Sequence, residues 1–416
     1  MKIPRGLLGL MVCVTCSSLS GIAHAQTPAP AQAPPAAAAP PPPPTPIPFD
    51  DALLKAANDL FSKANLNGAP DKLTLVIDPL IDGVTGAQSN ATHLEEKRIT
   101  DLVKSSYPRF QVARFSSDSV AKSPVVLIGT FTAVNNAGVA GGAKDAYRIC
   151  LALADMRTKT IISKGVARAL PQGIDPTPAA FFNDSPVFAK DASTDSYIKT
   201  CQGTKVGDNV DQAYADRIVV ASLVNDGIEA YDAGRYRDAL DAYQSALKTP
   251  GGEQLRVLNG IYLANIKLHR TRVAMAAFGK VIDYGLASDK LAVKFLFRPS
   301  STLFINDRSL RAPYDAWLET IAERTAAKQG CLEVVGHTSA TGLPAVNDRL
   351  SALRGDYIKD RLEDNEKSLR GRLIATGRGS REMIVGTGRD DASDALDRRV
   401  EFKVSPCGGA PGGRST

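Results

Sequence analysis

The stretch from Leu332 to Arg354, LEVVGHTSATGLPAVNDRLSALR, contains the side chains whose types and spacing could do chemistry. Four of them can bind a polar group through charge or hydrogen bonds: Thr338, Ser339, Asn347 and Arg354. Arginine offers a planar fork of donors that pairs with carboxylates. The carboxylate beside Arg354 belongs either to a bound ligand or to a nearby acid such as Asp348 or Asp356, and the sequence leaves both readings open.

The elements that must position these side chains are a strand, a turn and a helix. The β-branched run LEVVG predicts a strand that ends in a Gly-His-Thr turn. After a short loop, an amphipathic helix is predicted to begin at Asn347 and to carry Arg354 about two turns in. His337, within the turn, is expected to have a structural role.

This pattern resembles the core motif of the OmpA-like C-terminal domain of bacterial envelope proteins. That motif reads GHTD, followed at fixed distances by an Asn, an LS pair and an Arg. Asn347 and Arg354 keep this spacing, eight and fifteen residues after Ser339, which stands at the Asp position. The resemblance runs from Val293 to Val404 and implies a βαβαβ domain within residues 289–405. Its elements match in order at KFLFRP (294–299), YDAWLETIAERTAA (314–327), LEVVGHT (332–338), NDRLSALRGDYIKDRL (347–362) and DRRVEFKV (397–404).

In that family the domain binds the meso-diaminopimelate of peptidoglycan stems, with an Arg on its carboxylate and an Asp on its ammonium group. The resemblance implies the carboxylate role for Arg354 and supporting hydrogen bonds for Asn347 and Thr338. Ser339 supplies no charge, and Arg298 replaces an acid that often follows the first strand. Loss of one partner of a desolvated charge pair costs about 2 to 5 kcal/mol. Peptidoglycan binding is therefore expected to be weak, altered in specificity or absent.

A catalytic centre is hard to assemble from this sequence. Beyond the first 25 residues the chain has three histidines: His93, His269 and His337. Asp78 and Asp82 follow a predicted strand, where turn carboxylates are commoner than acid–base pairs. The segment 138–144, GVAGGAK, lacks the GxxxxGK[ST] spacing that surrounds phosphates, so it is predicted to be a hairpin loop. The sequence predicts a protein that is not an enzyme and needs no cofactor.

Four cysteines follow the first 25 residues: Cys150, Cys201, Cys331 and Cys407. They form no CxxC pair and histidines are scarce, so a zinc site is not expected. In an oxidising compartment an even number of cysteines favours disulfides. We prefer the pairs Cys150–Cys201 and Cys331–Cys407, because each pair falls within one predicted domain. Free buried thiols stay open as the alternative.

Residues 49–216 alternate strand and helix patterns and predict an α/β domain. A helix is predicted over residues 92–106, with Thr92 as its cap and Glu95 three residues later. Five strands are predicted, in KLTLVIDPL, FQVARF, PVVLIGTFTAV, YRICLALADM and TIISKGVARA. This order resembles the α/β domains of the CsgG, FlgO and LpoB-type envelope proteins, which implies a role in protein binding or assembly.

Residues 217–288 contain two long helical patterns. The first has small and aromatic residues in an arrangement that resembles a tetratricopeptide repeat: Gly227, Gly234, Tyr236, Ala239, Tyr243 and Ala246. The pattern recurs in degenerate form at Ala274, Phe278 and Val281. Stacks usually need three or more repeats for stability, so these helices are expected to pack on a neighbouring domain. A spacer between the two α/β domains and a peptide-binding groove stay open as their roles.

The first 25 residues predict a signal peptide, because Lys2 and Arg5 precede an apolar run and an Ala-His-Ala cleavage site. Residues 26–48 are mostly Pro and Ala and predict an extended linker, while residues 406–416 are expected to form a flexible tail. Removal of the signal lowers the net charge from +6 to about +4, with both signs interspersed, so no nucleic-acid partner is predicted. No later apolar run approaches the ~18 residues of a transmembrane helix.

Together these patterns predict a multidomain protein of α/β and α+β class that is secreted to the periplasm and associated with the outer membrane or cell wall. Its last domain is expected to bind peptidoglycan and its other domains to bind envelope proteins. An assembly or regulatory adaptor that does not bind peptidoglycan stays open as the alternative.

Overall fold

The computed structural model of the chain describes residues 43–140, 144–187, 190–289, 291–298, 300–328, 330–384, 386, 394, 397–405 and 407. The predicted signal peptide, most of the predicted linker and nearly all of the predicted tail lie outside these residues. Within the described part of the chain, no helix combines the length and the apolar character needed to cross a membrane.

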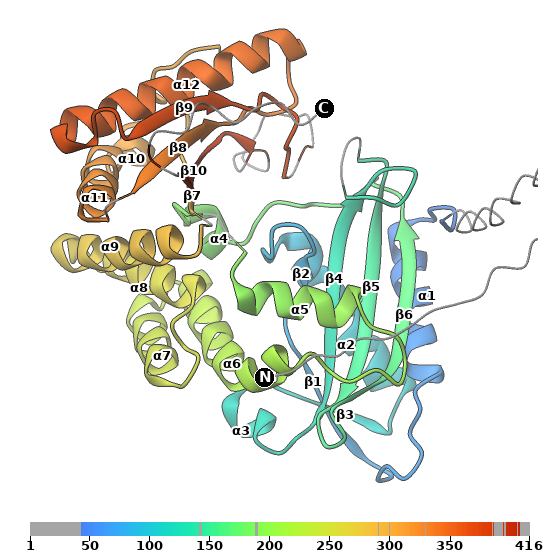
Figure 1. Cartoon of the computed structure of the whole chain (residues 1–416). Helices are drawn as coiled ribbons and strands as arrows, with labels where there is room; N and C mark the ends of the chain where they lie inside the picture. The colour runs from blue at the N-terminus through green and yellow to red at the C-terminus, as the bar shows by residue number, and fades with distance from the viewer. Residues whose placement is uncertain are drawn as a thin grey trace, which may run out of the picture. The chain divides into compact units, whose positions relative to one another are not determined.

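A mixed sheet organises the first part of the described chain, with strand order β3-β1-β4-β5-β6 and a short β2 beside β4 (Figure 1). Its strands are β1 (Leu73–Ile77), β2 (Ile81–Asp82), β3 (Phe110–Ala113), β4 (Val125–Val134), β5 (Ala146–Asp155) and β6 (Thr160–Ala169). The strand β1 runs parallel to β3 and β4, whereas β4, β5 and β6 form an antiparallel meander. The five strands predicted for this region are all present. Of the segment 138–144 predicted as a hairpin loop, residues 141–143 lie outside the described residues.

Both faces of this sheet are covered, which explains why β4 and β5 are buried along nearly their whole length. On one face lie α1 (Phe49–Ser62) and α2 (Asn90–Ser106), and on the other lies α5 (Ala192–Gln202). The approach of α1 requires glycine at position 165, since a Cβ there would stand 1.9 Å from the carbonyl oxygen of Ala56. The helix α1 was not predicted from the sequence.

The predicted cap of α2 was wrong by three residues. Ser89 caps the helix and exchanges hydrogen bonds with Thr92 in a capping box. Glu95, expected to complete a box with Thr92, is instead fully buried. Burial raises the pKa of Glu95 well above its ordinary value, with Glu96 adding to the effect. The Ser89 hydroxyl accepts a hydrogen bond from the backbone amide of Thr92, which lies in the first turn of the helix.

Four helices follow in two hairpins: α6 (Gln212–Asp232), α7 (Tyr236–Lys248), α8 (Leu255–Lys267) and α9 (Thr271–Ala287). Each helix packs against the next one along the chain. Tyr243 of α7 fills the space between Gly227 of α6 and Gly260 of α8, and a Cβ on either glycine would come within 2.5 Å of its ring. The predicted boundary between residues 216 and 217 lies inside α6, whose first turns pack under the first sheet.

The chain's own segment 180–187 packs against α6 and α8. It contains α4 (Ala180–Asp184), and Phe181 lies against the rings of Tyr231 of α6 and Tyr243 of α7. Its amide donates to Asp232 at 2.7 Å, and Tyr231 donates to Asp184 at 2.7 Å. Because the helices already hold this segment, we expect them to act as a spacer and not as a free peptide-binding groove.

The last part of the described chain forms a second mixed sheet of order β7-β10-β8-β9. Its elements are β7 (Leu291–Lys294), α10 (Arg308–Arg311), α11 (Tyr314–Ala327), β8 (Cys331–Gly336), α12 (Pro344–Asn365), η1 (Lys367–Leu369), β9 (Leu373–Gly377) and β10 (Arg399–Ser405). The strand β10 runs antiparallel to β7 and β8, while β8 and β9 are parallel. Two mixed sheets with packed helices confirm the predicted α/β and α+β fold class.

Two predicted boundaries in this region were wrong. The first strand ends at Lys294, so most of the segment 294–299 lies in the loop that follows it. The helix α12 begins at Pro344, three residues before Asn347, because proline suits the first position of a helix, where no amide partner is needed. Arg354 therefore lies about three turns into α12.

The helices α6 to α9 and the second sheet share one hydrophobic core. Phe278 of α9 stacks on Trp317 of α11 at 5.7 Å, and the Trp317 indole donates to the hydroxyl of Tyr262 on α8 at 2.8 Å. The expectation that these helices pack on a neighbouring domain is confirmed.

The two preferred cysteine pairs have different outcomes. Cys331 and Cys407 form a disulfide that joins the start of β8 to the residues after β10. The predicted disulfide between Cys150 of β5 and Cys201 of α5 is absent, and both residues are buried free thiols. Their Sγ atoms lie 2.7 Å apart, and each thiol donates to the other residue's carbonyl oxygen at 3.0 Å. This separation is shorter than the normal contact between two sulfur atoms that are not bonded to each other.

Candidate functional site

A cavity of about 260 Å³ lies between the loop after β7, the turn after β8 and the first half of α12. All four polar residues singled out from the sequence line it: Thr338, Ser339, Asn347 and Arg354. The other described lining residues are Leu296, Phe297, Ser300, Ile305, Thr341, Gly342, Val346, Leu350 and Arg398. The fold therefore brings together side chains that the sequence separates by up to 102 positions, from Leu296 to Arg398.

Arg354 is held in place by the loop that covers it. Its side chain is buried, and its Nε and Nη2 atoms donate to the carbonyl oxygens of Ser301 and Arg298 at 3.1 and 3.2 Å. The guanidinium carbon also lies 4.8 Å from the ring centre of Phe297, within range of a cation–π contact. Asp348, considered above as a partner for Arg354, pairs with Arg381. Arg354 thus fixes the loop and presents a positive charge beside the cavity.

The neutral polar residues form the wall opposite this loop. The Asn347 side chain donates to the carbonyl oxygens of Thr341 and Ser339 at 3.0 and 3.4 Å, which orders the turn after β8. The hydroxyl groups of Ser339 and Thr341 lie 3.2 Å apart. Thr338 is 3% exposed, and its hydroxyl has no hydrogen-bond partner among the described residues. Such a hydroxyl is suited to bind a polar group that enters the cavity.

The described lining of the cavity is positively charged. Arg398, immediately before β10, adds a second guanidinium to that of Arg354, and no described lining residue is an acid. Sequence reasoning did not select Arg398 as a site residue. It belongs to the closing strand motif, more than 40 residues after Arg354, and only the pairing of β10 with β8 brings it close.

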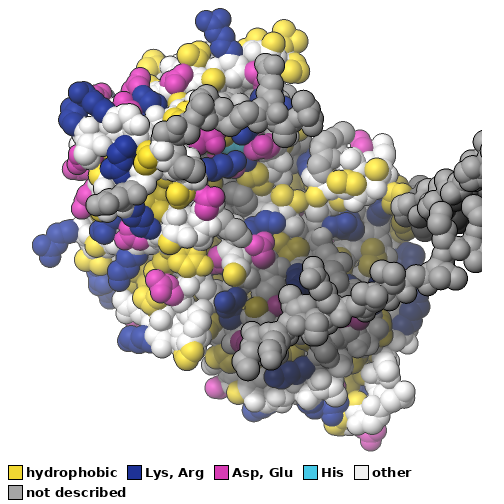
Figure 2. All heavy atoms as spheres, in the orientation of Figure 1, with side chains coloured by type: hydrophobic (Ala, Val, Ile, Leu, Met, Phe, Trp, Pro, Cys, Tyr) yellow, Lys and Arg dark blue, Asp and Glu magenta, His cyan; other side chains and the backbone are white. Residues whose placement is uncertain are grey.

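Apolar side chains border the same cavity. Val346 lines it and is 52% exposed, and Leu343, one turn earlier, is 72% exposed. Leu303, in the loop held by Arg354, is 50% exposed. Of these three residues only Val346 lines the cavity, where Leu350 and Ile305 join it to make part of the wall apolar. Elsewhere on the face drawn in Figure 2, basic and acidic side chains are interspersed.

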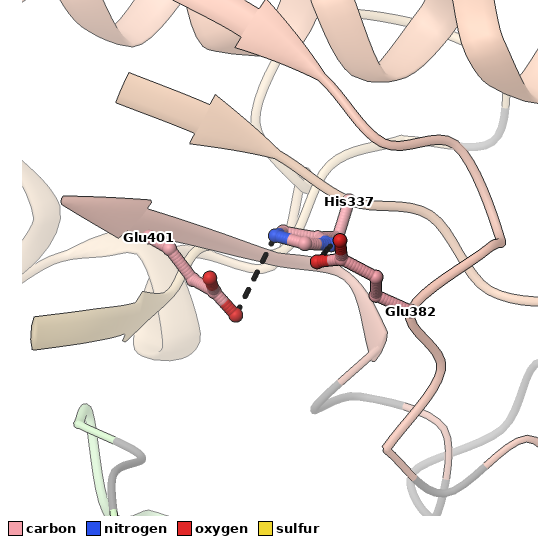
Figure 3. A group of neighbouring side chains, drawn as sticks. All are labelled: His337, Glu382 and Glu401. Carbon is pink, nitrogen blue, oxygen red and sulfur yellow. Dashed lines mark ion pairs between the residues drawn. The ribbon is translucent and has the colours of Figure 1, made fainter. Parts of the chain in front are cut away.

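His337, at the end of β8, lies between two glutamates, as Figure 3 shows. Its Nε2 atom is 3.5 Å from Glu401 and its Nδ1 atom is 3.9 Å from Glu382. A histidine and two carboxylates can hold a metal ion, and these three offer ligand atoms within 4.8 Å of one another. However, Arg399 already donates to Glu401 at 2.6 and 2.8 Å, and Arg378 lies 3.7 Å from Glu382.

These arginines would have to be displaced before a cation could bind, so the group does not favour a metal centre. Burial lowers the pKa of His337, although Glu401 partly opposes the effect. Burial disfavours ionisation of Glu401, yet His337 and Arg399 together hold the pKa of its carboxyl far below its ordinary value. His337 is therefore neutral near pH 7 and acts as a packed spacer between β8 and β10.

Asp78 and Asp82 do not form an acid–base pair. Asp82 accepts hydrogen bonds from the amides of Val84 and Thr85 at 3.0 and 2.6 Å, as a turn carboxylate does. Asp78 is buried and accepts a hydrogen bond from the Tyr214 hydroxyl at 2.7 Å. Burial raises the pKa of Asp78 to about 7. The cavity beside it measures about 40 Å³, enough for water but not for a substrate.

No protein-family model and no curated protein matches the sequence. Solved structures with a likeness to part of the chain include the cell wall anchor of the T6SS from Pseudomonas aeruginosa (24% identity, 27% of this chain and 78% of that chain, TM-score 0.23). They also include the periplasmic domain of Helicobacter pylori MotB (20% identity, 28% of this chain and 72% of that chain, TM-score 0.23). A third is the peptidoglycan-associated lipoprotein from Burkholderia pseudomallei (20% identity, 27% of this chain and 88% of that chain, TM-score 0.22). At these identities and TM-scores, the likenesses carry no argument about what this chain binds.

Proposed function

We propose that this chain is a non-enzymatic protein of the periplasm, associated with the cell wall or outer membrane, whose OmpA-like last domain binds the stem peptides of peptidoglycan. The observation that carries this proposal is the cavity beside α12. It gathers Arg354, Asn347, Thr338 and Ser339, the four residues at the positions that the OmpA-like motif uses for its ligand.

The chemistry of the cavity supports a carboxylate as the bound group. Two guanidinium groups and a buried hydroxyl without a described partner can bind one carboxylate together. The positions of these groups are fixed before binding, because Asn347 holds the turn after β8 and Arg354 holds the loop after β7. Preorganised groups lose little conformational freedom on binding, which favours affinity.

The remaining domains have the role of engaging envelope proteins. The described residues of the first domain contain no convergent nucleophile and base, and the helices α6 to α9 connect the two sheets through a shared core. In this proposal the last domain anchors the chain to the cell wall, and the first domain binds envelope proteins.

Co-sedimentation of the mature chain with purified peptidoglycan sacculi tests this function. We expect the wild type to sediment with the sacculi and Arg354→Ala to stay in the supernatant. Arg361→Ala is a matched control, because Arg361 lies two turns later on the same helix, where it pairs with exposed Asp315 and not with the cavity. No sedimentation of the wild type, or equal loss in both variants, would overturn the proposal. Co-purification of protein partners without peptidoglycan would favour an adaptor.

A further inference from the structure

The helix α12 has apolar residues on its solvent side as well as on its core side. It packs on β8 and β9 of the second sheet, where its buried residues join the hydrophobic core (Figure 1). Leu343, Val346 and Leu353 are instead 72%, 52% and 44% exposed, and Leu350 is half-buried. We call these four residues the outer stripe of α12. A helix that only had to cover the sheet would have polar residues on this side.

The outer stripe has the spacing of a seam between two helices. Its members follow one another at intervals of three, four and three residues, which is the apolar pattern of a coiled coil. Tyr357 continues the pattern four residues after Leu353 and is partly buried. The stripe extends about 15 Å along the helix. Only Val346 and Leu350 line the ligand cavity, so a ligand there leaves Leu343 and Leu353 uncovered.

Two charged residues beside the outer stripe indicate what covers it. Arg349 and Asp356 are exposed and lie seven residues apart on the same side of the stripe. Neither has an ion-pair or hydrogen-bond partner among the described residues. In an antiparallel pair of identical helices, residues at this position of the repeat lie opposite each other. Arg349 of one copy then meets the partner's Asp356, and twofold symmetry repeats the contact.

The apolar residues require the same alignment of the two helices. Leu350 packs on the partner's Leu353 when the twofold axis passes midway between them. That midpoint lies within one residue of the midpoint between Arg349 and Asp356, so one axis near Ala352 serves both contacts. A membrane surface fits the stripe less well. Helices that lie on membranes have mainly Lys and Arg beside their apolar face, whereas Asp356 is an exposed acid.

We propose that the outer stripe of α12 binds the same stripe of a second copy of this chain, antiparallel, so that the protein forms a homodimer. This inference goes beyond the proposed function, because the dimer forms without peptidoglycan. Two copies bring two ligand cavities to one particle, which strengthens attachment to a polymeric wall. A seam this short buries less surface than the roughly 1,600 Å² of a standard interface, so the fraction of dimer depends on concentration.

Sedimentation velocity of the mature full-length chain, over a range of concentrations and without peptidoglycan, tests the dimer. The wild type should convert from monomer to dimer as the concentration rises. Leu353→Glu places a charge from each copy in the seam and should stay monomeric throughout. Leu94→Glu is the matched control, because Leu94 is a 38% exposed leucine of α2, and this variant should dimerise as the wild type does. Circular dichroism checks that both variants are folded.

Exchange of the two charges tests the antiparallel arrangement. Arg349→Asp and Asp356→Arg each bring like charges together at both symmetric contacts. Each should raise the dissociation constant of the dimer at least about ten-fold. The variant with both substitutions restores opposite charges at these contacts and should recover the wild-type dissociation constant.

Three outcomes would contradict the inference. A wild type that stays monomeric at every concentration, or dimerisation that Leu353→Glu leaves unchanged, would overturn the dimer. A double charge variant that dimerises as weakly as the single variants would overturn the antiparallel pairing. If a monomeric wild type retains an envelope protein that Leu353→Glu loses, the stripe belongs to that protein. None of these measurements uses sacculi, so co-sedimentation tests the proposed function separately.

Discussion

Arg256 and Arg354 have similar local settings, and their comparison shows what distinguishes a structural arginine from a binding one. Arg256 of α8 donates to the carbonyl oxygen of Gly86 and lies 5.6 Å from the ring centre of Phe182. Arg354 of α12 likewise donates to backbone carbonyl oxygens and lies over a phenylalanine ring. Hydrogen bonding and stacking therefore do not separate the two.

What separates them is the surrounding charge and space. Burial lowers the pKa of Arg256, while Asp191 and Asp78 oppose the effect, and the adjoining cavity holds about 40 Å³. The cavity beside Arg354 holds about 260 Å³ and has no acid in its described lining. An arginine beside nearby acids and a small cavity stabilises the fold, whereas an arginine beside a larger cavity has room to pair with an anion from outside.

The strongest prediction concerns the acids around Arg256. Burial raises the folded-state pKa of Asp78 from an ordinary 3.8 to about 7, so its contribution to stability is complete below pH 4 and is lost as the pH rises through 7. The loss amounts to at most about 4 kcal/mol. Asp78→Asn should make the free energy of unfolding in urea less dependent on pH between 5 and 8. An unchanged pH profile would show that Asp78 is already ionised in the folded chain.

Removal of Arg256 should reduce stability without affecting the ligand site. Arg256→Met loses a hydrogen bond from a charged group and the attraction to nearby acids, a cost of about 1.5 to 3 kcal/mol. Urea unfolding should show this decrease, while the dissociation constant for a soluble peptidoglycan stem peptide should stay the same. Weaker peptide binding would mean that the two regions are coupled.

Replacement of Arg354 by lysine should affect binding more than folding. Arg354→Lys keeps the charge but loses the fork that donates to Ser301 and Arg298, so we expect about ten-fold weaker peptide binding, or about 1.4 kcal/mol. Titration calorimetry measures this effect, and Arg361→Lys serves as its control. Equal affinity of Arg354→Lys and the wild type would show that charge alone suffices.

Two asparagines allow the same comparison with a smaller effect. Asn347→Ala removes a hydrogen bond that orders the turn beside the ligand cavity, and Asn259→Ala removes one between α8 and Ser185. Each should lower the free energy of unfolding by about 1 kcal/mol. Only Asn347→Ala should also weaken peptide binding. A binding defect in Asn259→Ala would contradict the separation of the two regions.

The sequence predicted those features that depend on local pattern. The strands β4 to β6 are long apolar runs, and the spacing of Asn347 and Arg354 placed both on one helix. The helix α12 was predicted three residues short, because a proline can begin a helix as well as end one. In the same way, Ser89 and Thr92 could each cap the N-terminus of α2, and only the tertiary structure shows that Ser89 does so.

The features that the sequence did not predict depend on contacts between distant segments. Arg398 reaches the cavity through strand pairing, and Phe297 contacts Arg354 through a loop between strand and helix. The thiols of Cys150 and Cys201 lie side by side because α5 packs against β5, a contact that local sequence does not reveal. Local spacing therefore predicted the polar half of the site, and long-range packing supplied its second charge and its apolar border.

The most direct test of the proposed site is a paired measurement of dissociation constants for a soluble peptidoglycan stem peptide with the wild type, Arg354→Ala and Arg256→Met. We predict that Arg354→Ala binds at least about thirty-fold more weakly, the lower end of the loss expected for a desolvated charge partner. Arg256→Met should bind as the wild type does. Equal affinity in all three proteins, or an equal loss in both variants, would contradict the claim that Arg354 is the ligand-binding arginine.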